Sequence, residues 1–203
     1  MKTIRTEIEK LEKLFDSLNK HYYKNELPRP VIQYMNDPKG NRYGSISANK
    51  VWSNEDGTDT NYQLTIYANW KRPKQNIVAT LLHEMAHLYA LENGINDTSR
   101  RGRYHNANFR DIATAHGIMV TKVERLGWTE TTPTAETVEL CNKLGDIPSA
   151  WYNPIIPVEG PIAPKKPKTK WYTFVCADCG EVIKSKNPDL MAICSCGGGF
   201  IPA

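Results

Sequence analysis

The chain has 203 residues and a net charge of +4, and 40% of its residues are hydrophobic and 24% charged, which is the composition of a globular protein. No window approaches the run of about 18 apolar residues that a membrane span needs, so a membrane partner is excluded. The length suits one well-buried domain with a small appendage. The first residues mix both charge signs at helical spacing, unlike a signal peptide. We therefore expect a soluble cytoplasmic protein, and we expect it to be a monomer.

The first half of the chain predicts two helices with a small sheet between them. Apolar residues at helical spacing predict helices over residues 2–23 and 74–93, and Gly94 supplies a stop after the second. Three strand-like runs separated by turn-forming clusters predict a small antiparallel sheet. These runs cover residues 31–35, 44–52 and 62–68.

The second half predicts two shorter helices after an irregular, arginine-rich stretch. The first covers residues 106–116 and is ended by Gly117. The second covers residues 133–144, with Thr132 as its N-cap and Pro133 in its first position. Strands and helices in this order predict an α+β fold.

A proline-rich segment separates this domain from the end of the chain. Six prolines fall between Asp146 and Lys170, and this density predicts an extended tether. We therefore divide the chain into a globular domain (residues 1–145), a linker (146–170) and a C-terminal module (171–203).

The long predicted helix carries the sequence His83-Glu84-Met85-Ala86-His87. Two histidines four residues apart project from one face of a helix and can bind one ion. Glu84 lies one position round the helix, close to such an ion but not on it, where it can accept a proton from metal-bound water. Zinc lowers the pKa of that water from about 15.7 to roughly 7. The motif therefore predicts a catalytic zinc site with Glu84 as the general base.

A catalytic zinc takes three protein ligands and keeps one position open, so a third ligand is needed. The candidates downstream are Glu92, Asp97, His105, Asp111 and His116. Glu92 points away on the same helix, whereas His105 follows a loop long enough for the chain to return, so we predict His105. His116 lies roughly 16 Å further along the next helix and is expected to cap it. Ala90 stands where a metzincin has glycine, which excludes that class.

These segments resemble the SprT-like (Spartan-type) metallopeptidases. The resemblance rests on residues 81–87, Leu-Leu-His-Glu-Met-Ala-His, and residues 104–109, Tyr-His-Asn-Ala-Asn-Phe, although Asn106 stands where the family usually has glycine. It implies a zincin-like fold with His83, His87 and His105 as zinc ligands and Glu84 as the catalytic residue. It also implies action on proteins crosslinked to DNA. In zincins an edge strand pairs with an extended substrate, and residues 62–68 are the expected strand.

Four of the five cysteines fall in the last 30 residues, and Cys141 is expected to be a buried, inert thiol. In a chain without a secretion signal this clustering favours metal binding over disulfides. The four form a Cys-x-x-Cys pair and a Cys-x-Cys pair, each followed by glycine, and predict a zinc ribbon holding one structural ion. The predicted ligands are Cys176, Cys179, Cys194 and Cys196.

Aromatic and basic residues suggest DNA as a partner, with packing or a solvated surface as the alternative. In the C-terminal module the aromatics are Trp171, Tyr172, Phe174 and Phe200, near Lys170, Lys184 and Lys186. Near the histidine motif the basic runs are residues 71–74 and 100–103. The resemblance to SprT-like proteins, which are associated with DNA, favours nucleic acid.

The sequence thus predicts a zinc-dependent endopeptidase with one catalytic and one structural Zn²⁺, acting on DNA-associated or DNA-crosslinked protein substrates. The alternatives are a non-catalytic zinc-containing protein that binds DNA or regulates, and a peptidase whose substrate is a partner protein without DNA. Retention of Glu84 argues against a non-catalytic role, because a structural metal site has no use for a base. Tyr89, Arg103 and Tyr104 are all candidates for stabilising an oxyanion.

Overall fold

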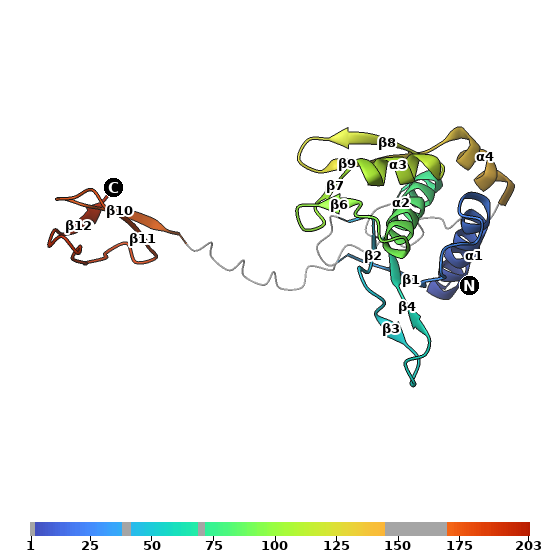
Figure 1. The fold of residues 1–203 in the computed structure, drawn as a ribbon, viewed down its shortest axis with the longest axis horizontal. Coiled ribbons are helices and arrows are strands. Elements are labelled where there is room, and N and C mark those ends of the chain that lie inside the picture. The colour runs from blue at the N-terminus through green and yellow to red at the C-terminus, as the bar shows by residue number, and fades with distance from the viewer. Residues whose placement is uncertain (1–2, 38–41, 69–71, 145–169) are drawn as a thin grey trace. The chain divides into compact units, whose positions relative to one another are not determined.

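The computed structural model describes residues 3–37, 42–68, 72–144 and 170–203. The chain divides into two compact units, Met1–Val158 and Glu159–Ala203 (Figure 1). The predicted linker at 146–170 lies outside the described residues except for Lys170, so its extended structure stays a prediction. None of the helices described is long and apolar enough to cross a membrane.

The described residues of the first unit form four helices, and the chain is of the α+β class. The helices are α1 (Ile4–Tyr22), α2 (Lys74–Glu92), α3 (Ala107–Ala115) and α4 (Ala135–Leu144). All four were predicted to within a few residues. The helix α4 begins later than predicted because Pro133 still pairs with Ile118 in a strand, and the Thr134 hydroxyl, not Thr132, caps it by accepting from the Thr137 N–H at 3.2 Å.

A three-stranded sheet precedes α2, in the order β1-β5-β2. Its strands are β1 (Val31–Met35), β2 (Gly44–Ile46) and β5 (Gln63–Tyr67). The pairing of β2 with β5 is antiparallel, but β1 pairs with β5 in parallel, so the prediction of a purely antiparallel sheet was wrong. The most buried strand, β5, takes the centre, and two reversals of the chain leave β1 running in the same direction.

The predicted strand over residues 44–52 is interrupted, since β2 ends at Ile46. Residue 52, the last residue of the predicted strand, belongs to a separate two-stranded sheet formed by β3 (Trp52–Ser53) and β4 (Thr60–Asn61). The Ser47 hydroxyl turns back to the Asn49 carbonyl at 2.7 Å, a local bond that competes with continued strand pairing.

A second sheet follows α2, in the order β6-β7-β9-β8, and its two long strands were not predicted. The strands are β6 (Thr98–Ser99), β7 (Tyr104–His105), β8 (Ile118–Val123) and β9 (Gly127–Pro133). Both long strands are mostly half-buried or exposed, so they lack the apolar alternation that identifies a strand from sequence.

The core of the first unit lies between α1, α2, α3 and the two sheets. Its fully buried side chains include Phe15 of α1, Leu64 and Ile66 of β5, and Phe109 of α3. The helix α2 is buried on most of its surface, which fixes its orientation and with it the direction of the side chains that leave it toward the cleft.

Residues 170–203, the described part of the second unit, contain a three-stranded antiparallel sheet in the order β11-β10-β12. The strands are β10 (Tyr172–Cys176), β11 (Val182–Ser185) and β12 (Phe200–Pro202). Phe174, which is 1% exposed, and Cys176 lie on the inner face of β10. So small a unit has little apolar surface to bury, and a bound metal is the usual way in which such units are stabilised.

Candidate active site and four-cysteine cluster

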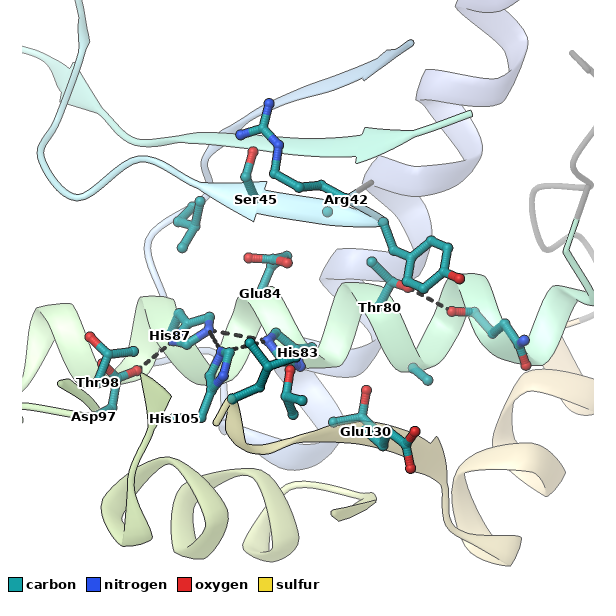
Figure 2. A pocket seen from close by; sticks show the side chains of 18 of the residues that line it. Arg42, Ser45, Thr80, His83, Glu84, His87, Asp97, Thr98, His105 and Glu130 are labelled. Carbon is teal, nitrogen blue, oxygen red and sulfur yellow. Dashed lines mark hydrogen bonds and ion pairs between the residues drawn. The ribbon is translucent and has the colours of Figure 1, made fainter. Parts of the chain in front are cut away.

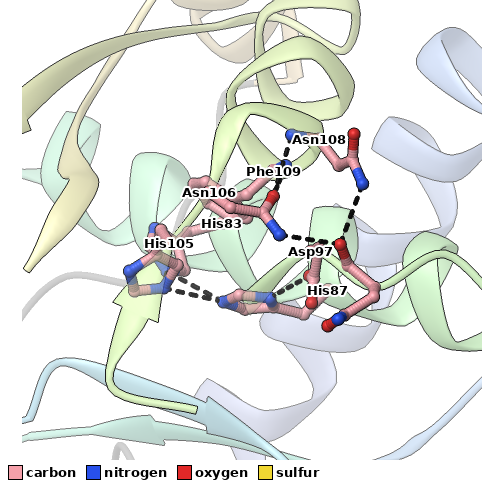
Figure 3. A network of polar contacts seen from close by, with 8 residues as sticks. His83, His87, Asp97, His105, Asn106, Asn108 and Phe109 are labelled. Carbon is pink, nitrogen blue, oxygen red and sulfur yellow. Dashed lines mark hydrogen bonds and ion pairs between the residues drawn. The ribbon is translucent and has the colours of Figure 1, made fainter. Parts of the chain in front are cut away.

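Three histidines meet at one point on the surface of α2. His83 and His87 lie one turn apart on the helix, and β7 brings His105 against them (Figure 3). The Nε2 atom of His87 is 3.2 Å from that of His83 and 3.1 Å from that of His105, and the remaining pair is 3.2 Å apart. The structure therefore brings together the three side chains that were predicted to share an ion.

The Phe109 ring packs against all three imidazole rings. Its side chain is fully buried, and its ring centroid lies 4.6 Å from those of His83 and His105 and 4.7 Å from that of His87. Asn106 starts the helix that holds Phe109, because its side-chain oxygen accepts from the N–H groups of Asn108 and Phe109 at 2.8 and 3.3 Å. The departure from glycine at this position is thus a helix cap.

Asp97 orients His87 by contacting Nδ1, the ring nitrogen on the side away from the other two histidines. Its carboxylate is 2.5 Å from Nδ1 of His87, so that nitrogen carries the proton and Nε2 keeps its lone pair toward the other histidines. The loop is held in place because Asn106 and Asn108 both donate to the carbonyl of Asn96, at 2.8 and 2.9 Å (Figure 3). The sequence offered Asp97 only as a ligand, and a carboxylate in the loop between two predicted ligands was the signal for this second role.

The electrostatics of the cluster favour a metal ion. Burial lowers the pKa of His83 well below its ordinary value and lowers that of His105 to about 4. Both rings are therefore neutral at pH 7 and offer lone pairs. Three imidazoles converging on one point form a donor set that suits zinc, so these residues could hold such an ion.

Glu84 lies beside the histidines, under the outer edge of β2. It is 6% exposed, and burial raises its pKa to about 7, while the backbone N–H of Ile46 bonds to the carboxylate and lowers the pKa. Gly44 allows this close approach. A Cβ atom there would lie 2.7 Å from both Glu84 Oε1 and Thr80 Cγ2. The strand could not lie so close to α2 with any larger residue at this position.

These side chains lie in a cleft of about 990 Å³. Figure 2 shows α2 along the cleft, with β2 on one side and β9 on the other. The expectation that residues 62–68 form the edge strand was wrong, because β5 pairs on both sides and β2 is the edge. The reason is burial, since the more apolar β5 occupies the middle of the sheet.

The other candidate ligands are engaged elsewhere. Glu92 bonds to Tyr62, Asp111 pairs with Arg110 at 2.7 Å, and His116 donates from Nδ1 to the Ile112 carbonyl at 2.6 Å. That last bond is the helix cap expected of His116.

Arg72 is not part of a solvated basic run. Its guanidinium donates to Thr80 Oγ1 at 2.8 Å and to the Tyr67 carbonyl at 3.0 Å. It therefore ties the end of β5 to α2. Arg100, Arg101 and Arg103 are exposed, as an interaction surface requires.

The four cysteines of the second unit form one cluster. Cys176 and Cys196 approach to 3.5 Å between sulfurs and Cys179 and Cys194 to 3.6 Å, distances too long for disulfides. The N–H groups of Cys179 and Asp178 lower the pKa of the Cys176 thiol to about 7. All four sulfurs lie within 4.8 Å of one another and could hold a metal ion. Cys141 lies apart, 4% exposed, and burial raises its pKa to about 11.

The aromatic residues of this unit occupy two kinds of environment, the interior and the surface beside lysines. Phe174 is buried and packs inside, as the alternative reading of the aromatics expected. Trp171 is 57% exposed and has the Lys186 ammonium 5.1 Å from its ring centroid, and Tyr172 has that of Lys170 at 4.9 Å.

The family model described as the SprT-like family matches residues 11–130, which is more than half of the chain. The chain belongs to the SprT-like family. No curated protein and no solved structure matched it. The matched part of this SprT-like protein runs from Leu11 of α1 to Glu130 of β9, so it contains the histidine cluster and Glu84 and ends before the four cysteines.

Proposed function

We propose that this SprT-like protein is a zinc-dependent endopeptidase of the zincin class. The observation that carries the proposal is the convergence of His83, His87 and His105 on one point of an open cleft, with the buried carboxylate of Glu84 beside it. Membership in the SprT-like family agrees with a protease-like activity. A purely structural ion would need neither the cleft nor the carboxylate.

In this proposal His83, His87 and His105 hold the zinc, and Asp97 keeps His87 in the binding tautomer. When bound, zinc would act as a Lewis acid that polarises the scissile carbonyl and lowers the pKa of water, so that hydroxide is available as a nucleophile at neutral pH. Glu84 takes the proton from the attacking water and passes it to the leaving amine. Burial raises the pKa of Glu84 in the metal-free site, which opposes the lowering that a nearby cation causes and favours a carboxylate that can accept and then release a proton. The outer edge of β2 binds the substrate backbone.

We propose further that the targets are proteins bound or crosslinked to DNA, and that the second unit is a zinc ribbon that contacts the DNA. Four thiolates would fill the coordination shell of a structural ion. The exposed Trp171 ring beside Lys186 is suited to stacking on an unpaired base while the ammonium faces a phosphate. The exposed arginines at residues 100–103 provide a second basic surface next to the cleft.

The experiment is cleavage of a DNA-binding protein, with and without single-stranded DNA, by the zinc-loaded wild type and by Glu84→Gln. Glu92→Gln is a matched control, because Glu92 is a carboxylate on the same helix that bonds to Tyr62. We expect Glu84→Gln to keep its zinc and to lose cleavage by about 10²–10⁴-fold, and Glu92→Gln to keep cleavage. No cleavage by a fully zinc-loaded wild type under any DNA condition would favour the non-catalytic DNA-binding alternative.

The DNA part of the proposal has its own test. Replacement of Trp171 and Lys186 by alanine should weaken binding of single-stranded DNA and reduce its salt dependence. Lys143→Ala is the control, since Lys143 is an exposed lysine of α4 in the other unit. Cleavage that is unaffected by DNA and by these changes would indicate a peptidase that acts without DNA.

A further inference from the structure

The cleft is bordered by two strand edges, one on each side of α2. A strand that turns its face to a cleft lines it with alternate residues, whereas a strand that turns its edge lines it with consecutive ones. The lining residues include 42–46, at and before β2, and 129–132, all in β9. Both strands therefore direct backbone groups into the same space.

The pairing pattern identifies which backbone groups of β2 face the cleft. The ladder to β5 includes bonds from the Tyr67 N–H to the Tyr43 carbonyl and from the Ser47 N–H to the Gln63 carbonyl, both at 2.9 Å. Because antiparallel bonding alternates, the intervening Gly44 and Ile46 direct their N–H and C=O groups outward. The Ile46 N–H faces Glu84, so the groups left for a substrate on this edge are the N–H and C=O of Gly44 and the C=O of Ile46.

The same reasoning assigns Thr131 to the facing edge. The Thr134 N–H donates to the Gly117 carbonyl at 3.0 Å, so Thr132 and Glu130 continue that ladder to β8 and Thr131 points the other way. On that other side β7 pairs with β9 only at Gly127. No described strand pairs with the N–H and C=O groups of Thr131.

The two edges run in opposite directions. Gly44 at the start of β2 lies against Thr80, and Ile46 follows toward the later turns of α2. Gly127 at the start of β9 lies against His105, and the strand leaves in the opposite direction, as Figure 2 shows. A polypeptide antiparallel to β2 would thus be parallel to β9, and both pairings are allowed. Its part C-terminal to the scissile bond would lie beside Thr131.

We propose that this part of the substrate is bound as a middle strand, hydrogen-bonded to β2 and to Thr131 of β9 at the same time. The inference rests on the proposed peptidase function and specifies its substrate as an extended, locally unfolded segment. A strand within a folded sheet or hairpin is rejected, because its own neighbouring strand already covers one of the two edges that must pair with β2 and with β9. A proline just after the scissile bond is rejected because it lacks an N–H.

The test is a scan of single N-methyl groups along a capped nonapeptide of alanine, serine and leucine. Binding is measured against zinc-loaded Glu84→Gln by competition with the fluorescein-labelled parent peptide. Successive residues of a strand turn to opposite sides, so two edges require consecutive amides. We expect methylation of two adjacent amides on the C-terminal side each to weaken binding about fivefold.

Sensitivity at strictly alternate amides would overturn the proposal, because one edge then suffices, and so would absence of binding. A peptide that binds in the consecutive pattern but is not cleaved by the zinc-loaded wild type would refute the peptidase function and leave the two-edge site standing. As a second variant, Thr131→Pro removes one donor and should weaken parent binding about fivefold. The zinc content and unfolding midpoint of Thr131→Pro show whether it is folded. If it is not, the peptide scan on Glu84→Gln remains the deciding test.

Discussion

Gly44→Ala would place a methyl group where β2 and α2 come closest. The added Cβ would lie 2.7 Å from Thr80 Cγ2 and from Glu84 Oε1, against an ordinary carbon contact of about 3.5–4.0 Å. Thr80 cannot yield, since its hydroxyl is fixed between Arg72 and the Asn76 carbonyl at 2.8 Å each. Either β2 must move by roughly 1 Å or Glu84 must rotate.

Overpacking of this kind costs about 1–3 kcal/mol of unfolding free energy. A displacement of about 1 Å at a catalytic group costs roughly 100-fold in rate, so we expect kcat for a peptide substrate to fall by that factor. Zinc content should not change, because the three atoms nearest the added Cβ belong to Glu84 and Thr80 and not to a histidine. Urea unfolding and steady-state hydrolysis measure the two effects. Gly199→Ala is the control, since a Cβ atom there meets nothing within 4 Å. Wild-type kcat in Gly44→Ala would refute the role of the close approach.

Four further outcomes are expected. Asp97→Asn should lower zinc affinity about 10–100-fold in a chelator competition, and unchanged affinity would show that His87 needs no orienting carboxylate. Without metal, Glu84 takes up a proton on folding between pH 4.5 and about 7. The unfolding free energy of the wild type should therefore fall by about 3 kcal/mol relative to that of Glu84→Gln as the pH rises through that window. Urea unfolding measures this, and an equal pH dependence in the two proteins would contradict it. Phe109→Ala should cost about 3–5 kcal/mol of unfolding free energy by leaving a cavity under the histidines, as calorimetry can check. Cys176→Ser should reduce zinc stoichiometry, measured by atomic absorption, and leave hydrolysis of a DNA-free peptide intact.

Local patterns predicted those parts of the molecule that depend on local interactions. The helices α1 and α2 follow from apolar spacing, and the grouping of His83 with His87 follows from their separation by one helical turn. The prediction of His105 depended on the assumption that the chain returns to α2 after the loop. The structure places His105 beside the other two histidines through the pairing of β7 with β9. That pairing joins residues far apart in sequence, which no local pattern encodes.

The features that could not be predicted depend on competition between segments. The central position of β5 reflects its greater burial relative to β2, a comparison that only the assembled sheet makes. The apolar residues of β8 do not alternate with polar ones, and β9 carries few apolar residues, so their pairing left no periodic signal. The assignment of Asp97 to His87 depended on the path of a loop. The edges that face the cleft were therefore misassigned or missed, although the chemistry on its floor was found.

The four-cysteine cluster and the three-histidine cluster differ in their sensitivity to oxidants. Cys179 and Cys196 are exposed, and peroxide oxidises accessible cysteines to sulfenic acids or disulfides, which could no longer bind a metal as a set of four thiolates. The imidazoles contain no sulfur and do not react in this way. If the four cysteines hold a structural zinc as proposed, mild oxidation would release that ion and destabilise the second unit while leaving the histidine cluster intact, and a reductase that restores the thiols would reverse the change.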